Sequence, residues 1–135
     1  MSFTAEADMA VAVQEPTTSV DFVTGAVVAN HRARAEPPVE LTLAELIDAP
    51  VEVGAIRGVM APSERSVEVV VDEESPLHLM NEVAWRLHAE GLSLNVLVGL
   101  ARLGDAHHEL RGTPCTLQGW WIDDDDVHFA GFETP

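Results

Sequence analysis

The segment PLHLMNEVAWRLHAE, residues 76–90, carries the clearest secondary-structure signal in the chain. This segment begins with a proline, which fits the first position of a helix, and the preceding Ser75 is a good N-cap. Gly91, directly after the segment, suits the left-handed conformation in which many helices end. Apolar side chains recur along it at helical spacing, namely Leu77, Met80, Val83, Ala84 and Leu87. This pattern predicts an amphipathic helix that buries the stripe, with Glu82 and Arg86 paired on its solvent side.

The segment before this helix predicts a short helix and a hairpin. Residues 41–49 place Leu43, Leu46 and Ile47 at helical spacing after Thr42, a suitable cap, and Pro50 ends the run, so a two-turn helix is expected. Residues 51–60 and 66–72 have extended patterns separated by a turn that contains proline and serine. The second of them alternates valine with polar residues, so the two are expected to pair as strands.

The segment after the helix predicts a strand and a second hairpin. Residues 94–103 fit either a buried strand or another helix, and the strand is favoured because Gly99 would weaken a helix interior. Residues 115–122 and 127–132 are two apolar strands joined by the acidic turn of residues 123–126.

These elements predict an α+β fold, with a mainly antiparallel sheet, one principal covering helix and an extended N-terminal arm. Residues 1–40 form the predicted arm because their apolar clusters lack the usual helix caps. Residues 41–135 form the predicted single domain, which is expected to stay folded without the arm.

Charge is the strongest feature of the composition. The chain has 135 residues, 23 of them acidic, and its seven basic residues are all arginine, giving a formal net charge of -16. A carboxylate-rich, lysine-free surface stays hydrated at high ionic strength, which indicates a halophilic or high-GC host. The same charge argues against binding to nucleic acid or to an anionic membrane.

Two groups of side chains contain residue types that bind metal ions. His107, His108 and His128, with Glu109, are residue types that bind transition metals, but adjacent histidines splay apart and no spaced His-x-x-x-His pair occurs. The acidic run 123–126 lacks the glycine and the alternating spacers of a calcium loop. Neither group is expected to hold a metal, and no cofactor is expected.

No catalytic constellation is predicted. The acidic residues 72–74 precede a helix start and suit its dipole, and the serines lie at turns and caps with no G-x-S-x-G motif. Cys115 has no basic neighbour in sequence and no CxxC partner, so it is expected to be a small core residue.

Two adjacent tryptophans mark the expected binding surface. Trp120 and Trp121 lie on one predicted strand, where successive side chains point to opposite faces, so one of them faces away from the core. Exposed tryptophans are enriched in interface hot spots, which favours partner binding, and coverage by the arm is the alternative. On the helix, His78, Trp85 and His88 form a strip that suggests a second kind of site, a pocket between helix and sheet.

The segment VVVDEESPLHLMNEVAWRL, residues 69–87, resembles the strand-to-helix passage of peptide-recognition domains in ribosomally made natural-product pathways. In those domains an extended stretch leads into a helix that opens with Leu-Asn-x-x-Ala. The resemblance implies that a strand runs directly into the helix of residues 76–90. The arm and the Trp-rich hairpin depart from that pattern, so no binding residue is carried over.

The sequence therefore predicts a non-enzymatic structural or interaction protein that binds copies of itself or a larger scaffold. A virion component, such as a capsid cement or a tail protein of a halophile or actinobacterial virus, fits this description. The alternatives are a small ligand-binding or regulatory domain and, less favoured, a metal-dependent enzyme. A cytoplasmic or virion-associated location is expected, because neither a signal peptide nor an apolar run of ~18 residues is apparent.

Overall fold

The computed structural model describes residues 19–33 and 37–135, so about half of the predicted arm, residues 1–18 and 34–36, lies outside the described residues. The elements are, in chain order, α1 (Ser19–Ala33), β1 (Val39–Thr42), α2 (Leu43–Leu46), β2 (Arg57–Ala61), η1 (Pro62–Glu64), β3 (Ser66–Val70), α3 (Leu77–Ala89), β4 (Ser93–Gly99), η2 (Leu100–Arg102), α4 (Leu103–Glu109), β5 (Thr116–Asp123) and β6 (Asp126–Glu133). The described part is thus α+β, as the sequence predicted.

Six strands form one sheet in which the order in space equals the order in the chain, β1-β2-β3-β4-β5-β6. Pairing is antiparallel for β1/β2, β2/β3 and β5/β6 but parallel for β3/β4 and β4/β5. The sheet is therefore mixed, and the prediction of a mainly antiparallel sheet matches it only loosely. The physical reason is that α3 and the η2–α4 segment are crossover connections. Each of them returns the chain to the end of the sheet where the previous strand began, so the next strand runs parallel to it.

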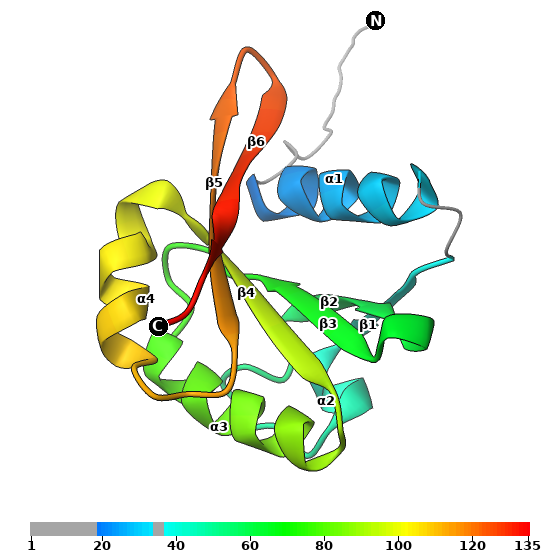
Figure 1. Ribbon diagram of the computed structural model, residues 1–135, viewed down its shortest axis with the longest axis vertical. Coiled ribbons are helices and arrows are strands. Elements are labelled where there is room, and N and C mark those ends of the chain that lie inside the picture. Colours follow the sequence, from blue (N-terminus) through cyan, green and yellow to red (C-terminus); the bar gives the residue numbers. More distant parts are fainter. Residues whose placement is uncertain (1–18, 34–36) are drawn as a thin grey trace, which may run out of the picture.

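Helices cover both faces of the sheet, whereas one principal covering helix was predicted. Figure 1 shows α3 and α1 on opposite sides of the strands, with α4 beside β5. The larger core lies between the α3 side and one sheet face, and includes Met80, Leu87, Val96 and Leu117. A smaller core lies beneath α1 on the other face.

Helix α3 confirms the prediction made for residues 76–90. Its buried residues are Leu77, Met80, Val83, Ala84 and Leu87, the predicted stripe. Arg86 forms an ion pair with Glu82 on the exposed side. Gly91, after the end of the helix, has a φ of +75°, the left-handed conformation that was predicted. The prediction for Ser75 was wrong: Pro76 occupies the cap position, and its ring has no acceptor for a helix N–H group. The Ser75 hydroxyl, one position earlier, donates to Asp72.

Residues 19–33, which were predicted to be part of an extended arm, are helical. Val23 and Val27 of α1 are buried against Val59, Val70 and Leu97 of the sheet. These apolar strand positions lie on the face opposite α3 and would meet water without α1, which accounts for its docking. The predicted boundary at residue 40 also falls inside β1.

The remaining local predictions have mixed outcomes. Both hairpins are present as β2–β3 and β5–β6, the strand favoured for residues 94–103 is β4, and Thr42 caps α2 in a capping box with Glu45. Strand β4 is shorter than predicted and ends at Gly99, and α2 has one turn where two were predicted, because the backbone is already extended at Ile47. Residues 103–109 include His107 and His108, for which no helix or strand was predicted, and form α4, whose buried residue Ala106 packs in the larger core.

We predict that α1 is part of the cooperative fold. Replacing Val23, which is fully buried, by Ala should lower the free energy of unfolding by about 2 kcal/mol, because two methyl groups lose their packing against the sheet. Chemical denaturation measures the change. Val51→Ala is the control, since Val51 is 89% exposed and the change should stay within about 0.5 kcal/mol. Equal stability of the two variants would show that α1 does not belong to the core.

Candidate functional site

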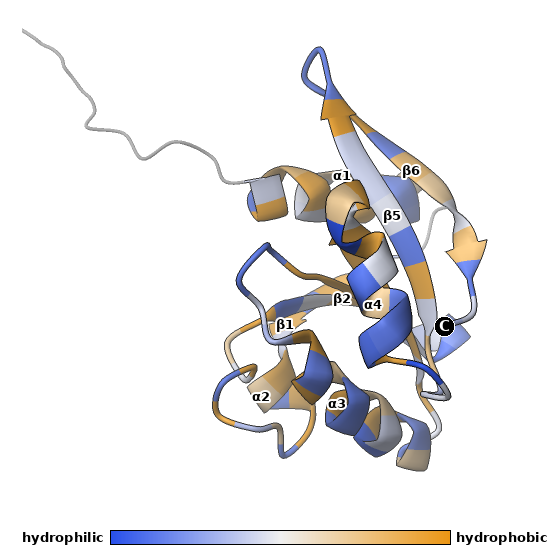
Figure 2. Cartoon of the chain, turned by 90° about the vertical axis from the view of Figure 1, so that its left-hand side faces the viewer, coloured by the Kyte–Doolittle hydropathy of each residue, from blue (hydrophilic) through white to orange (hydrophobic). Residues whose placement is uncertain are grey.

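The β5–β6 hairpin projects beyond the rest of the sheet. Strand β4 pairs with β5 only as far as the couple Gly99↔Trp120, whereas β5 and β6 continue to pair from Trp121↔His128 to Asp123↔Asp126. We call residues 121–128 the ribbon tip. Figure 1 shows it standing clear above α1, and its hydrophilic turn is visible in Figure 2.

The tryptophans at the base of the ribbon tip point to opposite faces, as predicted. Trp120 packs with Val127, Phe129 and Val20 against the smaller core beneath α1. Its indole Nε1 atom is buried and has no hydrogen-bond partner among the described residues. Trp120 is therefore principally a packing residue. It is covered by α1, which lies within the predicted arm, so the alternative to partner binding applies to this side chain.

Trp121 lies on the other face and is 39% exposed. Its ring stacks on the imidazole of His128 with centroids 5.3 Å apart and planes 16° from parallel. Leu100, which is 48% exposed, lies over Gly119 on the same face, where a Cβ at residue 119 would come within 2.7 Å of Leu100 Cδ1. The absence of a side chain at Gly119 thus leaves room for an apolar surface next to Trp121.

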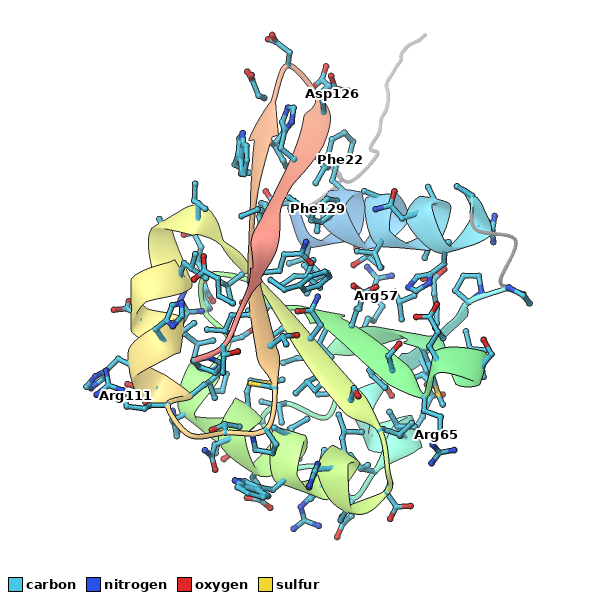
Figure 3. All side chains as sticks on the ribbon, viewed as in Figure 1. Phe22, Arg57, Arg65, Arg111, Asp126 and Phe129 are labelled. Atoms are coloured by element: carbon cyan, nitrogen blue, oxygen red, sulfur yellow. The ribbon has the colours of Figure 1, made fainter. Side chains whose placement is uncertain are left out.

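The turn of the ribbon tip is acidic and conformationally demanding. Asp124 and Asp125 both have positive φ, 49° and 66°, as a tight hairpin turn requires. Figure 3 shows Asp126 near this turn and Phe129 lower down, at the level of α1. The ribbon tip therefore presents carboxylates at its end and an aromatic surface below them.

The histidines considered as metal ligands are not brought together. His107 lies on α4 and pairs with Glu133 of β6, whereas His128 stacks on Trp121 in the ribbon tip. His108 is exposed on α4. In the described part of the chain, no three His, Cys, Asp or Glu side chains are grouped as a metal site.

The strip of His78, Trp85 and His88 lies on the solvent side of α3. Trp85 is 51% exposed, and its ring contacts the imidazole of His88 edge to face at a centroid distance of 5.9 Å. The strip as a whole does not line a pocket between α3 and the sheet, because the residues of α3 that face the sheet are the apolar stripe. His88 instead borders a cavity at the end of the helix.

That cavity, which we call the Glu68 cavity, lies at the amino ends of the parallel strands. Its volume is about 560 Å³, and it lies between the end of α1, the starts of β3, β4 and β5, and Phe132 of β6. Cys115 also lines it, and burial raises the pKa of the Cys115 thiol to about 11. The thiol is therefore protonated near neutral pH and is a poor nucleophile.

A row of polar side chains crosses the sheet in this cavity. Glu68, Asn95 and Thr116 are successive register partners on β3, β4 and β5. The Asn95 amide donates to Glu68 Oε2 at 3.2 Å and to Gln118 Oε1 at 3.0 Å, and its oxygen accepts from Thr116 Oγ1 at 2.8 Å. His31, at 2% exposure, lies 2.8 Å from Glu68 Oε1 through Nε2.

Sequence reasoning missed this polar row. The available signal was Asn95 in the middle of an apolar strand, where a buried polar side chain requires partners. Glu68 gave no such signal because it occupies the polar position of an alternating strand.

A second cavity, the Asp72 cavity, lies at the carboxyl ends of β3 and β4 and has a volume of about 1120 Å³. Its charged groups largely bond to one another and to the backbone. Arg57 pairs with Asp21 of α1, and Arg102 donates to the carbonyl oxygens of Asp72 and Ser75. Figure 3 shows Arg57 between α1 and the sheet.

The Asp72 carboxylate organises the loop between β3 and α3. Oδ1 accepts from the backbone N–H groups of Glu74 and Ser75 at 2.9 and 2.7 Å, and from the Ser75 hydroxyl at 2.8 Å. Partial burial raises the pKa of Asp72, but these hydrogen bonds and the charge of Arg102 outweigh it and hold the pKa below its ordinary value. Asp72 and Arg102 therefore fix the strand-to-helix passage, whereas the Arg57–Asp21 pair joins β2 to α1.

Comparisons with protein-family models, with curated proteins and with solved structures found no match for the chain. The strand-to-helix passage that the sequence resemblance implied is present as β3, its loop and α3. No helix within residues 19–33 and 37–135 has the length and apolar character needed to cross a membrane.

We predict that the two tryptophans differ in their contribution to stability. Trp120→Ala should lower the free energy of unfolding by about 3 kcal/mol or more, because the smaller core loses its largest ring. Trp121→Ala should cost about 1 kcal/mol or less, since it removes only a cross-strand contact on an exposed surface. Denaturation monitored by circular dichroism compares them. Similar large losses would mean that both faces of the hairpin are core.

We also predict that Ser75→Ala raises the pKa of Asp72 toward the usual ~3.9, because the hydroxyl donor to the carboxylate is lost. Since the native pKa is lowered, these bonds stabilise the fold fully above the unfolded-state pKa, and that stability is lost as pH falls through the native pKa. NMR titration of the carboxyl carbon measures the shift. Ser93→Ala, at the far end of β4, should leave it unchanged, and an unaltered pKa in Ser75→Ala would contradict the assignment.

Proposed function

We propose that the protein is a non-enzymatic interaction protein, a subunit of a larger assembly, and that its partner binds the ribbon tip. The observation that carries this proposal is the exposed Trp121–His128 stack on a hairpin that extends beyond the sheet. A two-stranded ribbon is only marginally stable in isolation, and exposed aromatic residues are concentrated in hot spots of protein interfaces. Both properties favour a surface that is covered in a complex.

The open edge of β6 supports the same proposal. In the described sheet, β6 is the last strand and pairs with β5 alone. Its outer edge can offer backbone N–H and C=O groups to an added strand, the arrangement by which many extended segments bind to sheets. Trp121, at 39% exposure on the same hairpin, provides a side-chain contact beside this edge.

Charge favours a partner with basic side chains. The ribbon tip ends in four aspartates, residues 123–126, and the chain as a whole carries a formal charge of -16. Two copies would repel each other at low ionic strength, whereas a basic partner surface would be attracted. Self-assembly is therefore expected mainly at high salt. A virion scaffold of a halophile or actinobacterial virus remains one assembly that fits this composition.

Photo-crosslinking followed by titration tests the proposal. A photoreactive phenylalanine analogue replaces Trp121 in one sample and Trp85, exposed on α3, in the control. We expect the first to crosslink reproducibly to one protein in an extract of the native source, or to a second copy in molar salt. The partner so identified is then purified and titrated against the variants.

In that titration, Trp121→Ala should weaken binding by about 2 kcal/mol or more, roughly 30-fold, because a central aromatic contact is lost. Trp85→Ala should bind like the wild type, since α3 lies outside the proposed surface. Unchanged affinity in Trp121→Ala, or the same crosslinks from both positions, would overturn the proposal.

A further inference from the structure

We propose that the Glu68 cavity binds a small organic cation with a primary ammonium or guanidinium group. This site is separate from the ribbon tip and does not depend on partner binding there. It has a volume of about 560 Å³, within the ~300–1,000 Å³ usual for small-molecule sites, and charged and polar side chains converge at its floor.

The buried donors at the floor of the cavity are already used. Both amide hydrogens of Asn95 are donated, one to Glu68 and one to Gln118, and the Thr116 hydroxyl donates to Asn95. His31 uses Nε2 for its contact with Glu68. What remains available is acceptor capacity, because a carboxylate has about four lone-pair sites and Glu68 uses two in these bonds. The floor therefore suits a ligand that donates hydrogen bonds.

The charge of the lining selects a cation among such donors. Glu64 and Glu68 both line the cavity, and its basic lining residues are two histidines, His88 and the Glu68 partner His31, with no arginine among the described lining residues. The protonated Cys115 thiol is neutral, and the sequence contains no lysine that could place an ammonium group in the cavity. An N⁺–H group would form charge-assisted hydrogen bonds with Glu68, whereas an anion would be repelled by both glutamates.

Phe132 supplies an apolar and aromatic wall. Its side chain is 66% exposed and lines the cavity on the same sheet face as its register partner Gln118. An aromatic ring attracts a cation placed over its face and also covers the alkyl part of the ligand. The combination of a carboxylate floor with a phenyl wall thus fits an amine with a short apolar body.

Calorimetric titration of the full chain at fixed ionic strength tests the proposal, with butylammonium chloride and butylguanidinium chloride as probes. We expect saturable one-to-one binding of at least one probe in the millimolar range or tighter. Butanol, which has the same chain without charge, and butyrate, which has the opposite charge, should not bind. If neither cation binds, the proposal is overturned.

Variants separate a built site from general attraction to an acidic protein. Glu68→Gln should weaken binding by about tenfold or more, because a charged acceptor becomes neutral while the shape is kept. Glu82→Gln removes the same charge from the exposed face of α3 and should bind like the wild type. Equal affinity in all three proteins would mean that the cation responds only to the net charge, and the proposal would fail.

A second readout covers the case in which Glu68→Gln does not fold. In the wild type, the side-chain NH2 resonances of Asn95 and Gln118 should shift with the probe at the concentration dependence of the calorimetric binding. Thr116→Val should weaken probe binding, because it removes a floor acceptor without changing charge. Probe-induced shifts confined to surface carboxylates would place the cation elsewhere and overturn the assignment.

Discussion

Strands β3, β4 and β5 pair in parallel, and this pairing determines where the helices must pack. A strand with parallel neighbours is generally buried on both faces, and β4 shows it, with five consecutive buried residues from Leu94 to Val98. The α3 side covers one face. The other face needs its own cover, and α1 provides it over Val70, Leu97 and Trp120. The N-terminal helix is therefore a requirement of the central strand order.

The same pairing explains why a polar row can exist inside the sheet. Parallel register places Glu68, Asn95 and Thr116 side by side, so each can satisfy its neighbour without water. His31, near the end of α1, then reaches the carboxylate of Glu68. Apolar packing has no preferred direction, whereas this contact fixes where α1 ends on the sheet. Helix position and cavity shape are thus coupled.

The sequence revealed the elements whose signals are local. Helix α3, with Leu77 to Leu87 on its buried side, was predictable from periodicity and its glycine exit, and the hairpins were predictable from alternation and turn residues. The opposite orientations of Trp120 and Trp121 followed from strand geometry alone. The relative direction of neighbouring strands was harder to predict, because no local sequence signal distinguishes a parallel crossover connection from an antiparallel one.

Helices α1 and α4 were missed for a related reason. Val23, Val27 and His31 do recur every four residues, but α1 has no strong capping signal, and its need to cover a second face emerges only from the complete sheet. The Glu68 cavity could not be predicted for the same reason, because its lining residues come from α1, α3 and four separate strands. One sequence feature does predict a second covering layer. Residues 94–98 are apolar except for Asn95, and a strand with apolar residues at successive positions is buried on both faces.

The order of strands also has a consequence for how the chain can fold. Each strand pairs with its neighbour in sequence, so the sheet can grow by adding one strand at a time with short loop closures. Helix α1 is the exception, since its contacts Val59, Leu97 and Phe129 extend almost to the end of the chain. Among the described elements, α1 is synthesised before the strands that it contacts and completes these contacts only after β6. Its apolar side therefore stays without its full cover until the β5–β6 hairpin has left the ribosome.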